Sequence, residues 1–144
     1  MRLSVEMNIE SLPTDRLDDA IELWRQVGLT RPWNDPRDDL QRALASPSSV
    51  VLAGLDGETL ISTAMVGYDG HRGWVYYLAV RPGFRGYGHG RAIMNASQAW
   101  LAERQVPKLN IMVRGANAAA IGFYEALGYT RDDVMILSRR LHRS

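Results

Sequence analysis

The sequence predicts an α/β (α+β) protein whose central sheet is mixed, mostly antiparallel, built of six to seven strands and flanked by four helices. Three observations carry this prediction. Apolar residues alternate with polar ones in several short segments and recur at helical spacing in others. The dipeptide Asp56-Gly57 between two β-like segments is a strong hairpin signal. Later, a β-like segment leads through a glycine-rich loop into a helical pattern.

The chain begins with a predicted strand and a predicted helix. Leu3, Val5 and Met7 alternate with polar residues, which is typical of a strand with one buried face. Thr14 or Asp15 is expected to cap a helix that ends at Gly28. The apolar positions of this helix are Leu17, Ala20, Ile21, Leu23, Trp24 and Val27.

A second, shorter helix is expected to run from Pro36 to about Ala45, with Asp35 as its N-cap. The loop between the two helices, residues 31–34, contains Trp33 and Asn34. Neither helix pattern requires so large an aromatic residue. Two interpretations stay open: a loop that contacts substrate, or a tryptophan that closes the edge of the core.

Residues 50–55, 60–68 and 74–80 are predicted strands. Asp56-Gly57 joins the first two, and the turn of residues 69–73 joins the second to the third. Short connections of this kind link antiparallel neighbours, so the three strands should form an antiparallel meander.

The glycine loop follows the third of these strands. After Pro82, glycines recur as Gly86, Gly88 and Gly90, and a helical pattern starts at about Arg91. Such a loop leaves several backbone N–H groups aimed at one point, at the positive end of a helix dipole, which suits an anion and most naturally a phosphate. Arg81, Arg85 and Arg91 flank the loop and would add charge-assisted contacts.

Two other phosphate-binding loops do not fit. A P-loop ends in Gly-Lys-Ser/Thr, which is absent, and a dinucleotide fingerprint would require glycine where Arg91 stands. A bare tight turn remains the structural alternative, although it needs only one or two glycines.

The last third of the chain is predicted to alternate helix and strand. The helix that starts at about Arg91 runs to about residue 103, and residues 109–113 form a strand. A helix over residues 117–127 ends at Gly128, and residues 134–141 form the last strand. No linker or repeat interrupts the pattern, so we expect one domain over residues 1–144.

Composition excludes several classes of function. With 46% hydrophobic and 23% charged residues the chain is an ordinary globular protein. It has no apolar run of about 18 residues and no signal-peptide core, so we expect a cytoplasmic protein without a membrane partner. The absence of cysteine and the scatter of three histidines argue against a metal site. A net charge of +1 gives no general attraction to nucleic acid.

The glycine loop closely resembles the acyl-CoA pyrophosphate loop of the GNAT family of N-acetyltransferases. The matching residues are Val80-x-Pro82 followed by Arg85-x-x-Gly88-x-Gly90. A second family motif is similar too: Asn117, then FYEALGY over residues 123–129. The order of predicted elements matches the family over nearly the whole chain, and the segments LTRPWNDP, GYDGHRG, YYLAV and DDVMILSRRL are similar to the small bacterial YpeA-like members.

The resemblance implies a GNAT fold, acetyl-CoA as cofactor, and direct transfer of an acetyl group to a primary amine of a small molecule or of a peptide or protein N-terminus. The expected cofactor-binding residues are Leu78, Ala79, Val80, Arg85, Gly86, Tyr87, Gly88, His89, Gly90, Arg91 and Asn117. Tyr124 is the candidate acid for the CoA thiolate, and its alternative role is that of a half-buried helix tyrosine. A homodimer is expected only from the family.

The acceptor site and the general base are less defined. We expect Trp33, Asn34, Asp69 and His71 to bind the amine, because no core pattern explains them. Relatives that acetylate protein N-termini often carry a glutamate where this chain has Met112. Other candidate bases are Asp69, His71, Asp35, and Tyr76 or Tyr77; Asp69 could equally be a turn former and His71 a solvated loop residue. A catalytically silent acyl-CoA-binding or regulatory module is the alternative function.

Overall fold

The computed structural model of the chain describes residues 6–141. The chain divides into two compact units, Met1–Ile111 and Met112–Ser144. The single domain expected over residues 1–144 stays a prediction. Of the predicted first strand, Leu3 and Val5 lie outside the described residues. The first described strand, β1 (Asn8–Ser11), begins just after Met7.

The first unit contains a five-stranded sheet with the order β1-β2-β3-β4-β5. Its other strands are β2 (Ser49–Asp56), β3 (Thr59–Tyr68), β4 (Gly73–Val80) and β5 (Leu109–Asn110). Strands β1 to β4 pair antiparallel with their neighbours, whereas β5 runs parallel to β4. The predicted antiparallel meander of β2, β3 and β4 is therefore confirmed, as is a mixed sheet.

The predicted number of strands, six to seven, is wrong, since the described residues form five. Strand β5 has two residues instead of the five predicted over residues 109–113, because only Leu109 and Asn110 find partners on β4. Residues 134–141 form no strand, although their sequence is strongly apolar. A strand requires a hydrogen-bonded neighbour, and the described side chains of Val134 to Leu137 are instead 56–89% exposed.

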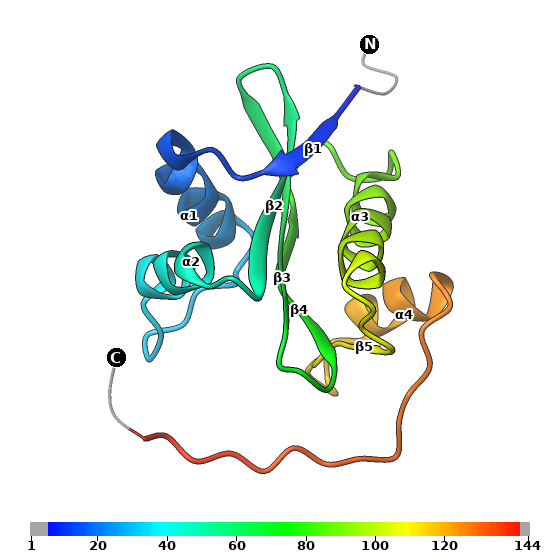
Figure 1. Cartoon of the computed structure of the whole chain (residues 1–144). Helices are drawn as coiled ribbons and strands as arrows, with labels where there is room; N and C mark the ends of the chain where they lie inside the picture. The colour runs from blue at the N-terminus through cyan, green and yellow to red at the C-terminus, as the bar shows by residue number, and fades with distance from the viewer. Residues whose placement is uncertain (1–5, 142–144) are drawn as a thin grey trace. The chain divides into compact units, whose positions relative to one another are not determined.

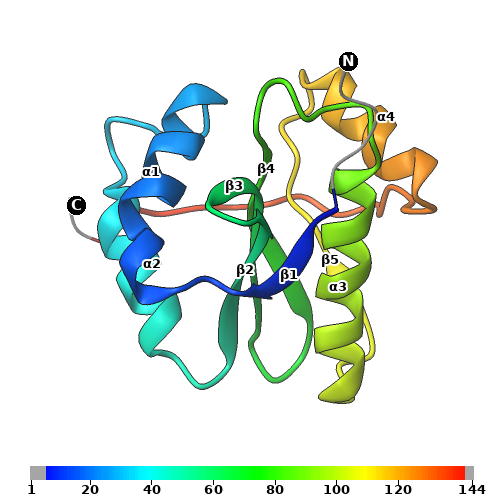
Figure 2. The same cartoon turned by 90° about the horizontal axis from the view of Figure 1, so that it is seen from above.

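Helices cover both faces of this sheet. A 3-10 turn, η1 (Thr14–Arg16), leads into α1 (Leu17–Gln26), which lies with α2 (Pro36–Ala45) on one face. The long helix α3 (His89–Glu103) lies on the opposite face, as the view from above also shows (Figures 1 and 2). With α4 (Ala118–Ala126) of the second unit, the four predicted helices are present.

The predicted cap of the second helix is confirmed, and that of the first is wrong. The Asp35 carboxylate accepts hydrogen bonds from the backbone N–H groups of Arg37 at 2.9 Å and Asp38 at 3.4 Å. Thr14 and Asp15 lie inside η1, so neither can cap α1. No side chain caps the start of η1 or the start of α1. The extra turn therefore replaces the expected side-chain cap.

The main core lies between α1, α2 and the sheet. Apolar side chains from both helices and from three strands bury one another there: Leu12, Ala20, Ile21, Leu23, Trp24, Leu40, Ala43, Val51, Ala53, Leu55, Leu60 and Ala79. Helix α3 buries Ile93, Met94, Ser97 and Leu101. No described helix has the length and apolarity needed to cross a membrane. Within residues 6–141 no cluster of metal-ligating side chains occurs.

Candidate active site

The glycine loop lies between the end of β4 and the start of α3. Gly83, Gly86 and Gly88 have φ angles of +93°, +85° and +83°, a conformation that L-residues with a side chain rarely adopt. Gly88 is the N-cap of α3, and it supplies no side-chain hydrogen bond to the first turn. The first N–H groups of a 15-residue helix are thus left to an outside acceptor.

A methyl group built on Gly83, Gly86 or Gly88 would meet no protein atom within 4 Å. The side of each glycine to which a Cβ would point is therefore free of neighbouring protein atoms. This geometry fits a group that needs close contact with backbone N–H donors.

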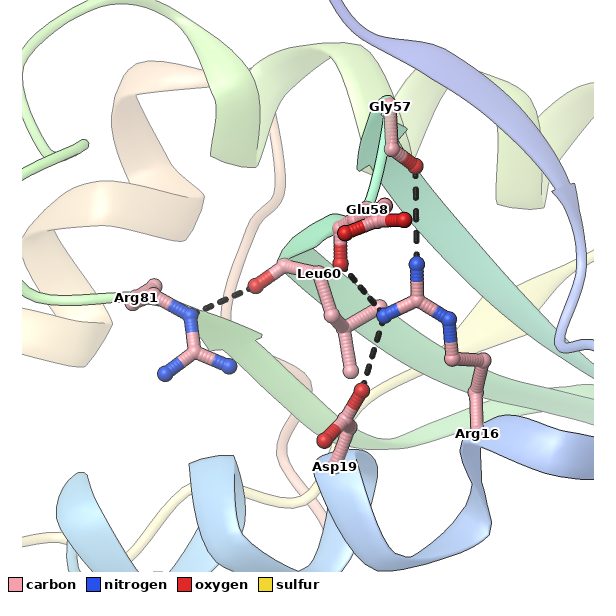
Figure 3. A network of polar contacts seen from close by, with 6 residues as sticks. All are labelled: Arg16, Asp19, Gly57, Glu58, Leu60 and Arg81. Carbon is pink, nitrogen blue, oxygen red and sulfur yellow. Dashed lines mark hydrogen bonds and ion pairs between the residues drawn. The ribbon is translucent and has the colours of Figure 1, made fainter.

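Two of the three arginines that flank the loop are used by the protein itself. Arg81 donates through Nε to the carbonyl of Leu60 at 2.6 Å, which ties the end of β4 to β3 (Figure 3). Arg85 donates to the carbonyl of Val80 at 3.3 Å. Arg91 lies exposed in the first turn of α3. Figure 3 also shows Arg16, which binds Asp19 and the carbonyls of the β2–β3 turn. Arg81 thus stabilises the strand end rather than offering its Nε to a phosphate.

Strand β4 has one occupied edge and one open edge. Along one edge it pairs with β3 up to Val80. Along the other it pairs with β5 only at Gly73 and Trp74. Among the described strands, none pairs with this second edge from Val75 to Val80, which includes the predicted cofactor residues Leu78, Ala79 and Val80. An extended ligand with amide groups could pair there as an added strand.

A β-bulge interrupts β4 in the same region. Tyr77 and Leu78 together lie opposite Ala64, because Thr63 pairs with Ala79 and Met65 pairs with Tyr76. Tyr77 has a φ of +53°, which is unusual for an aromatic residue. A bulge displaces main-chain groups from the regular ladder and changes their direction. It therefore alters what the edge of β4 presents to a ligand.

His89, the first residue of α3, has a side chain that is only 6% exposed. Its ring lies 6.4 Å from the rings of both Phe84 and Tyr87. Nε2 of His89 has no hydrogen-bond partner within the described part of the chain. The imidazole is thus packed against aromatic side chains of the loop. If His89 contacts a cofactor, as predicted, its backbone N–H is the group best suited to do so.

The turn before β4 is built around Asp69. Its carboxylate accepts hydrogen bonds from the backbone N–H groups of His71 at 2.9 Å and Arg72 at 2.8 Å, and from Nε1 of Trp74 at 3.1 Å. These bonds lower the pKa of Asp69 from 3.8 to about 2, and the bond from Arg72 has the largest effect. Asp69 is therefore a turn former and a very weak base.

The other predicted acceptor residues lie in exposed loops of the first unit. His71 belongs to the same turn as Asp69 and is exposed. Trp33 is 43% exposed in the loop between α1 and α2, and Asn34 beside it is also exposed. Trp33 therefore does not close the edge of the core. Binding of an amine by these residues stays a prediction.

The second unit carries Asn117 and Tyr124. The Asn117 side chain caps α4 by accepting from the N–H of Ala120 at 3.1 Å, a structural task that the sequence motif did not reveal. The Tyr124 ring lies edge-on to Phe123 and Tyr129, with centroids at 5.1 and 5.8 Å. Burial, and secondarily the neighbouring Tyr129, raises the pKa of Tyr124 to about 12. Its hydroxyl therefore keeps its proton at neutral pH.

Sequence reasoning missed the group of side chains around the bulge. Trp24, Thr63 and Asp39 contact Tyr77 or one another, yet the sequence pattern indicated only that Trp24 lies on the apolar face of a helix. The one signal was the pair of adjacent tyrosines, Tyr76 and Tyr77, in a strand where consecutive side chains should point to opposite faces.

Comparison with known proteins agrees with this geometry. The family model described as "Acetyltransferase (GNAT) family" matches residues 17–129. An acetyltransferase of Yersinia pestis (strain Pestoides F) is 42% identical over 135 residues, which cover 94% of this chain and 96% of the relative. An acetyltransferase of Sodalis glossinidius is 42% identical over 137 residues, with the same shares of both chains.

Solved structures show the same fold at much lower identity. The aminoglycoside N-acetyltransferase AAC(6')-Iy in complex with CoA has a TM-score of 0.81 and 16% identity, and the match covers 99% of each chain. An aminoglycoside acetyltransferase from an uncultured soil metagenomic sample, in complex with sisomicin, has a TM-score of 0.77 and 18% identity, and the match covers 94% of this chain and 97% of that one.

Proposed function

Since the chain belongs to the acetyltransferase (GNAT) family, we propose that it transfers the acetyl group of acetyl-CoA directly to a primary amine of a small molecule or of a peptide or protein N-terminus. The observation that carries this proposal is that an edge of β4 without a partner strand from Val75 to Val80 leads, along the chain, into the glycine loop and the start of α3, which no side chain caps. A long ligand with amides at one end and a pyrophosphate at the other suits that path.

The residues of the path would divide the binding of acetyl-CoA between them. Main-chain groups of Leu78, Ala79 and Val80 would pair with the pantetheine arm. The backbone N–H groups of residues 85–90 would hold the pyrophosphate. One N–H of β4 would face the thioester oxygen as negative charge develops on it, and Tyr124 would supply the proton to the departing thiolate.

The amine must lose its proton before it can attack the thioester. A lysine amine with a pKa of about 10.4 lies roughly 3.4 units above neutrality, which corresponds to about 4.6 kcal/mol, whereas an α-amine with a pKa near 7.8 requires only about 1 kcal/mol. Met112 stands where some relatives carry a glutamate, and Asp69 is held as an anion with a pKa of about 2. Without a glutamate at position 112 and with Asp69 so weakly basic, the site favours an α-amine or another amine of low pKa.

The proposal is tested by two measurements on the same preparation. Calorimetry with acetyl-CoA, CoA and, as a control, NAD measures whether the path binds an acyl-CoA. Release of free CoA thiol is then followed against a library of amino acids, peptide N-termini, lysine side-chain analogues and aminoglycosides. We expect acetyl-CoA to bind and α-amines to outperform ε-amines at neutral pH. Binding of acetyl-CoA with no amine-dependent thiol release would identify a silent acyl-CoA-binding module instead.

A further inference from the structure

Tyr77 is held in a strained backbone conformation at the centre of the β4 bulge. Its φ is +53°, and among the described residues only one other that is not glycine, Gln105, has a positive φ. An aromatic residue persists in this region only where its surroundings determine the conformation. The contacts of Tyr77 therefore indicate what keeps the bulge in place.

The main chain of Tyr77 is fixed by a buried polar chain. Oγ1 of Thr63 donates to the Tyr77 carbonyl at 2.8 Å, and Nε1 of Trp24 donates to the same Oγ1 at 2.9 Å. The side chains of Thr63 and Trp24 are both fully buried. A carbonyl that the bulge has moved out of the regular ladder thus receives a side-chain donor instead.

The side chain of Tyr77 is fixed by the same group of residues. Its ring stacks on the Trp24 indole, with centroids 4.0 Å apart and planes at 17°. Its hydroxyl donates to Oδ2 of Asp39 in α2 at 2.7 Å, and Arg42 binds the other carboxylate oxygen of Asp39 at 2.6 Å. Burial, followed by the hydrogen bond to Asp39, raises the pKa of Tyr77, so the hydroxyl remains a donor.

The contacts form a closed set. Trp24 stacks on the ring of Tyr77 and donates to the Thr63 hydroxyl, which in turn donates to the Tyr77 carbonyl. Asp39 accepts from the hydroxyl at the far end of the Tyr77 ring. Simple core packing would explain the stacked rings of Trp24 and Tyr77. It would not require the hydrogen bonds that Thr63 and Asp39 make to the main chain and the hydroxyl of Tyr77.

We propose that Trp24, Thr63, Tyr77 and Asp39 are positioning residues that hold the β4 bulge in the conformation that aims its main chain at the acyl group of the cofactor. This inference rests on the proposed function, because the edge of β4 is where that function places the thioester. Donors that stabilise a developing oxyanion must lie within a few tenths of an ångström of their best position. Small displacements of reacting groups cost large factors in rate.

The test compares three variants with a matched control. Tyr77→Phe removes the hydroxyl and keeps the stacked ring. Asp39→Ala removes the acceptor, and Asp39→Asn restores an oxygen that can accept from the tyrosine. Tyr68→Phe removes a hydroxyl from another partly buried tyrosine of the same sheet. We expect Tyr77→Phe and Asp39→Ala to lower kcat roughly 10- to 100-fold with KM for acetyl-CoA within about twofold, and Asp39→Asn and Tyr68→Phe to stay near wild type.

A second readout does not depend on activity. Amide hydrogen exchange, measured by mass spectrometry on peptides that cover β4 and β2, should rise in β4 and not in β2 for Tyr77→Phe and Asp39→Ala. If wild-type protein acetylates no amine, the proposed function fails while exchange still tests whether these side chains hold the bulge. Unchanged kcat together with unchanged exchange in β4 would overturn the positioning role, as would an equal loss of kcat in Tyr68→Phe.

Discussion

Replacement of Gly88 by alanine tests the glycine loop as the cofactor site. Gly88 has a φ of +83°, and a Cβ at this position meets no protein atom within 4 Å. The new methyl group therefore causes no internal clash, but it occupies the space through which a phosphate would reach the backbone. We expect Gly88→Ala to fold and to bind acetyl-CoA weakly.

The expected magnitudes separate backbone strain from loss of binding. An alanine held in the left-handed region costs about 1–2 kcal/mol, which should appear as lower stability to urea. A hydrogen bond to a charged group contributes about 1.5–3 kcal/mol, so losing one at the pyrophosphate should weaken acetyl-CoA binding by roughly 10- to 150-fold.

Gly28→Ala is the matched control. Gly28 has a φ of +77°, follows the C-terminus of α1, and a Cβ built on it likewise meets no protein atom within 4 Å. It should lose a similar amount of stability and bind acetyl-CoA as the wild type does. Isothermal titration calorimetry measures the affinities, and urea unfolding measures the stabilities. Unchanged affinity in Gly88→Ala, or an equal loss of affinity in Gly28→Ala, would refute the assignment of the pyrophosphate to this loop.

Three further predictions concern Tyr124, Asp69 and Asp35. Tyr124→Phe should lower kcat by about 10²- to 10⁴-fold with little change in acetyl-CoA affinity, since general acid catalysis acts mainly in the transition state, and full kcat with chemistry rate-limiting would contradict the acid role. Because the pKa of Asp69 falls from 3.8 to about 2 on folding, its contribution to stability is present above pH 3.8 and lost as the pH falls towards 2. The stability difference between wild type and Asp69→Asn in urea should shrink over that window, and a constant difference would be evidence against it. Asp35→Ala should lower the free energy of unfolding by about 0.5–2 kcal/mol and Asp35→Asn by much less, because only asparagine retains a capping oxygen; equal losses would argue against the cap.

Features that depend on a few neighbouring residues could be predicted from the sequence. The Asp35 cap, the Asp56-Gly57 hairpin and the glycine loop before α3 are specified by local backbone preferences, and the structure contains all three. The meander follows directly, because short turns can join only antiparallel neighbours.

Features that depend on distant partners could not be predicted. The apolar run Val134–Leu137 has the composition of a buried strand, but whether a segment becomes a strand is decided by a pairing edge elsewhere in the chain. The bulge at Tyr77 is set by side chains 14 and 38 residues away, Thr63 and Asp39, and no local pattern records them. The sequence motif around Asn117 likewise did not show that its amide oxygen is already used to cap α4.

The exposed side chains of Val134, Met135, Ile136 and Leu137 have a consequence for how the protein behaves in concentrated solution. Four consecutive large apolar side chains in a segment without regular secondary structure attract one another across molecules. Sulfate strengthens that attraction because it is excluded from protein surfaces. We therefore expect the chain to salt out at low ammonium sulfate concentration and its second virial coefficient to become negative as salt is added. Light scattering over a sulfate series, with Ile136→Lys as comparison, would follow this solubility directly, and purification at low salt should keep the chain dispersed.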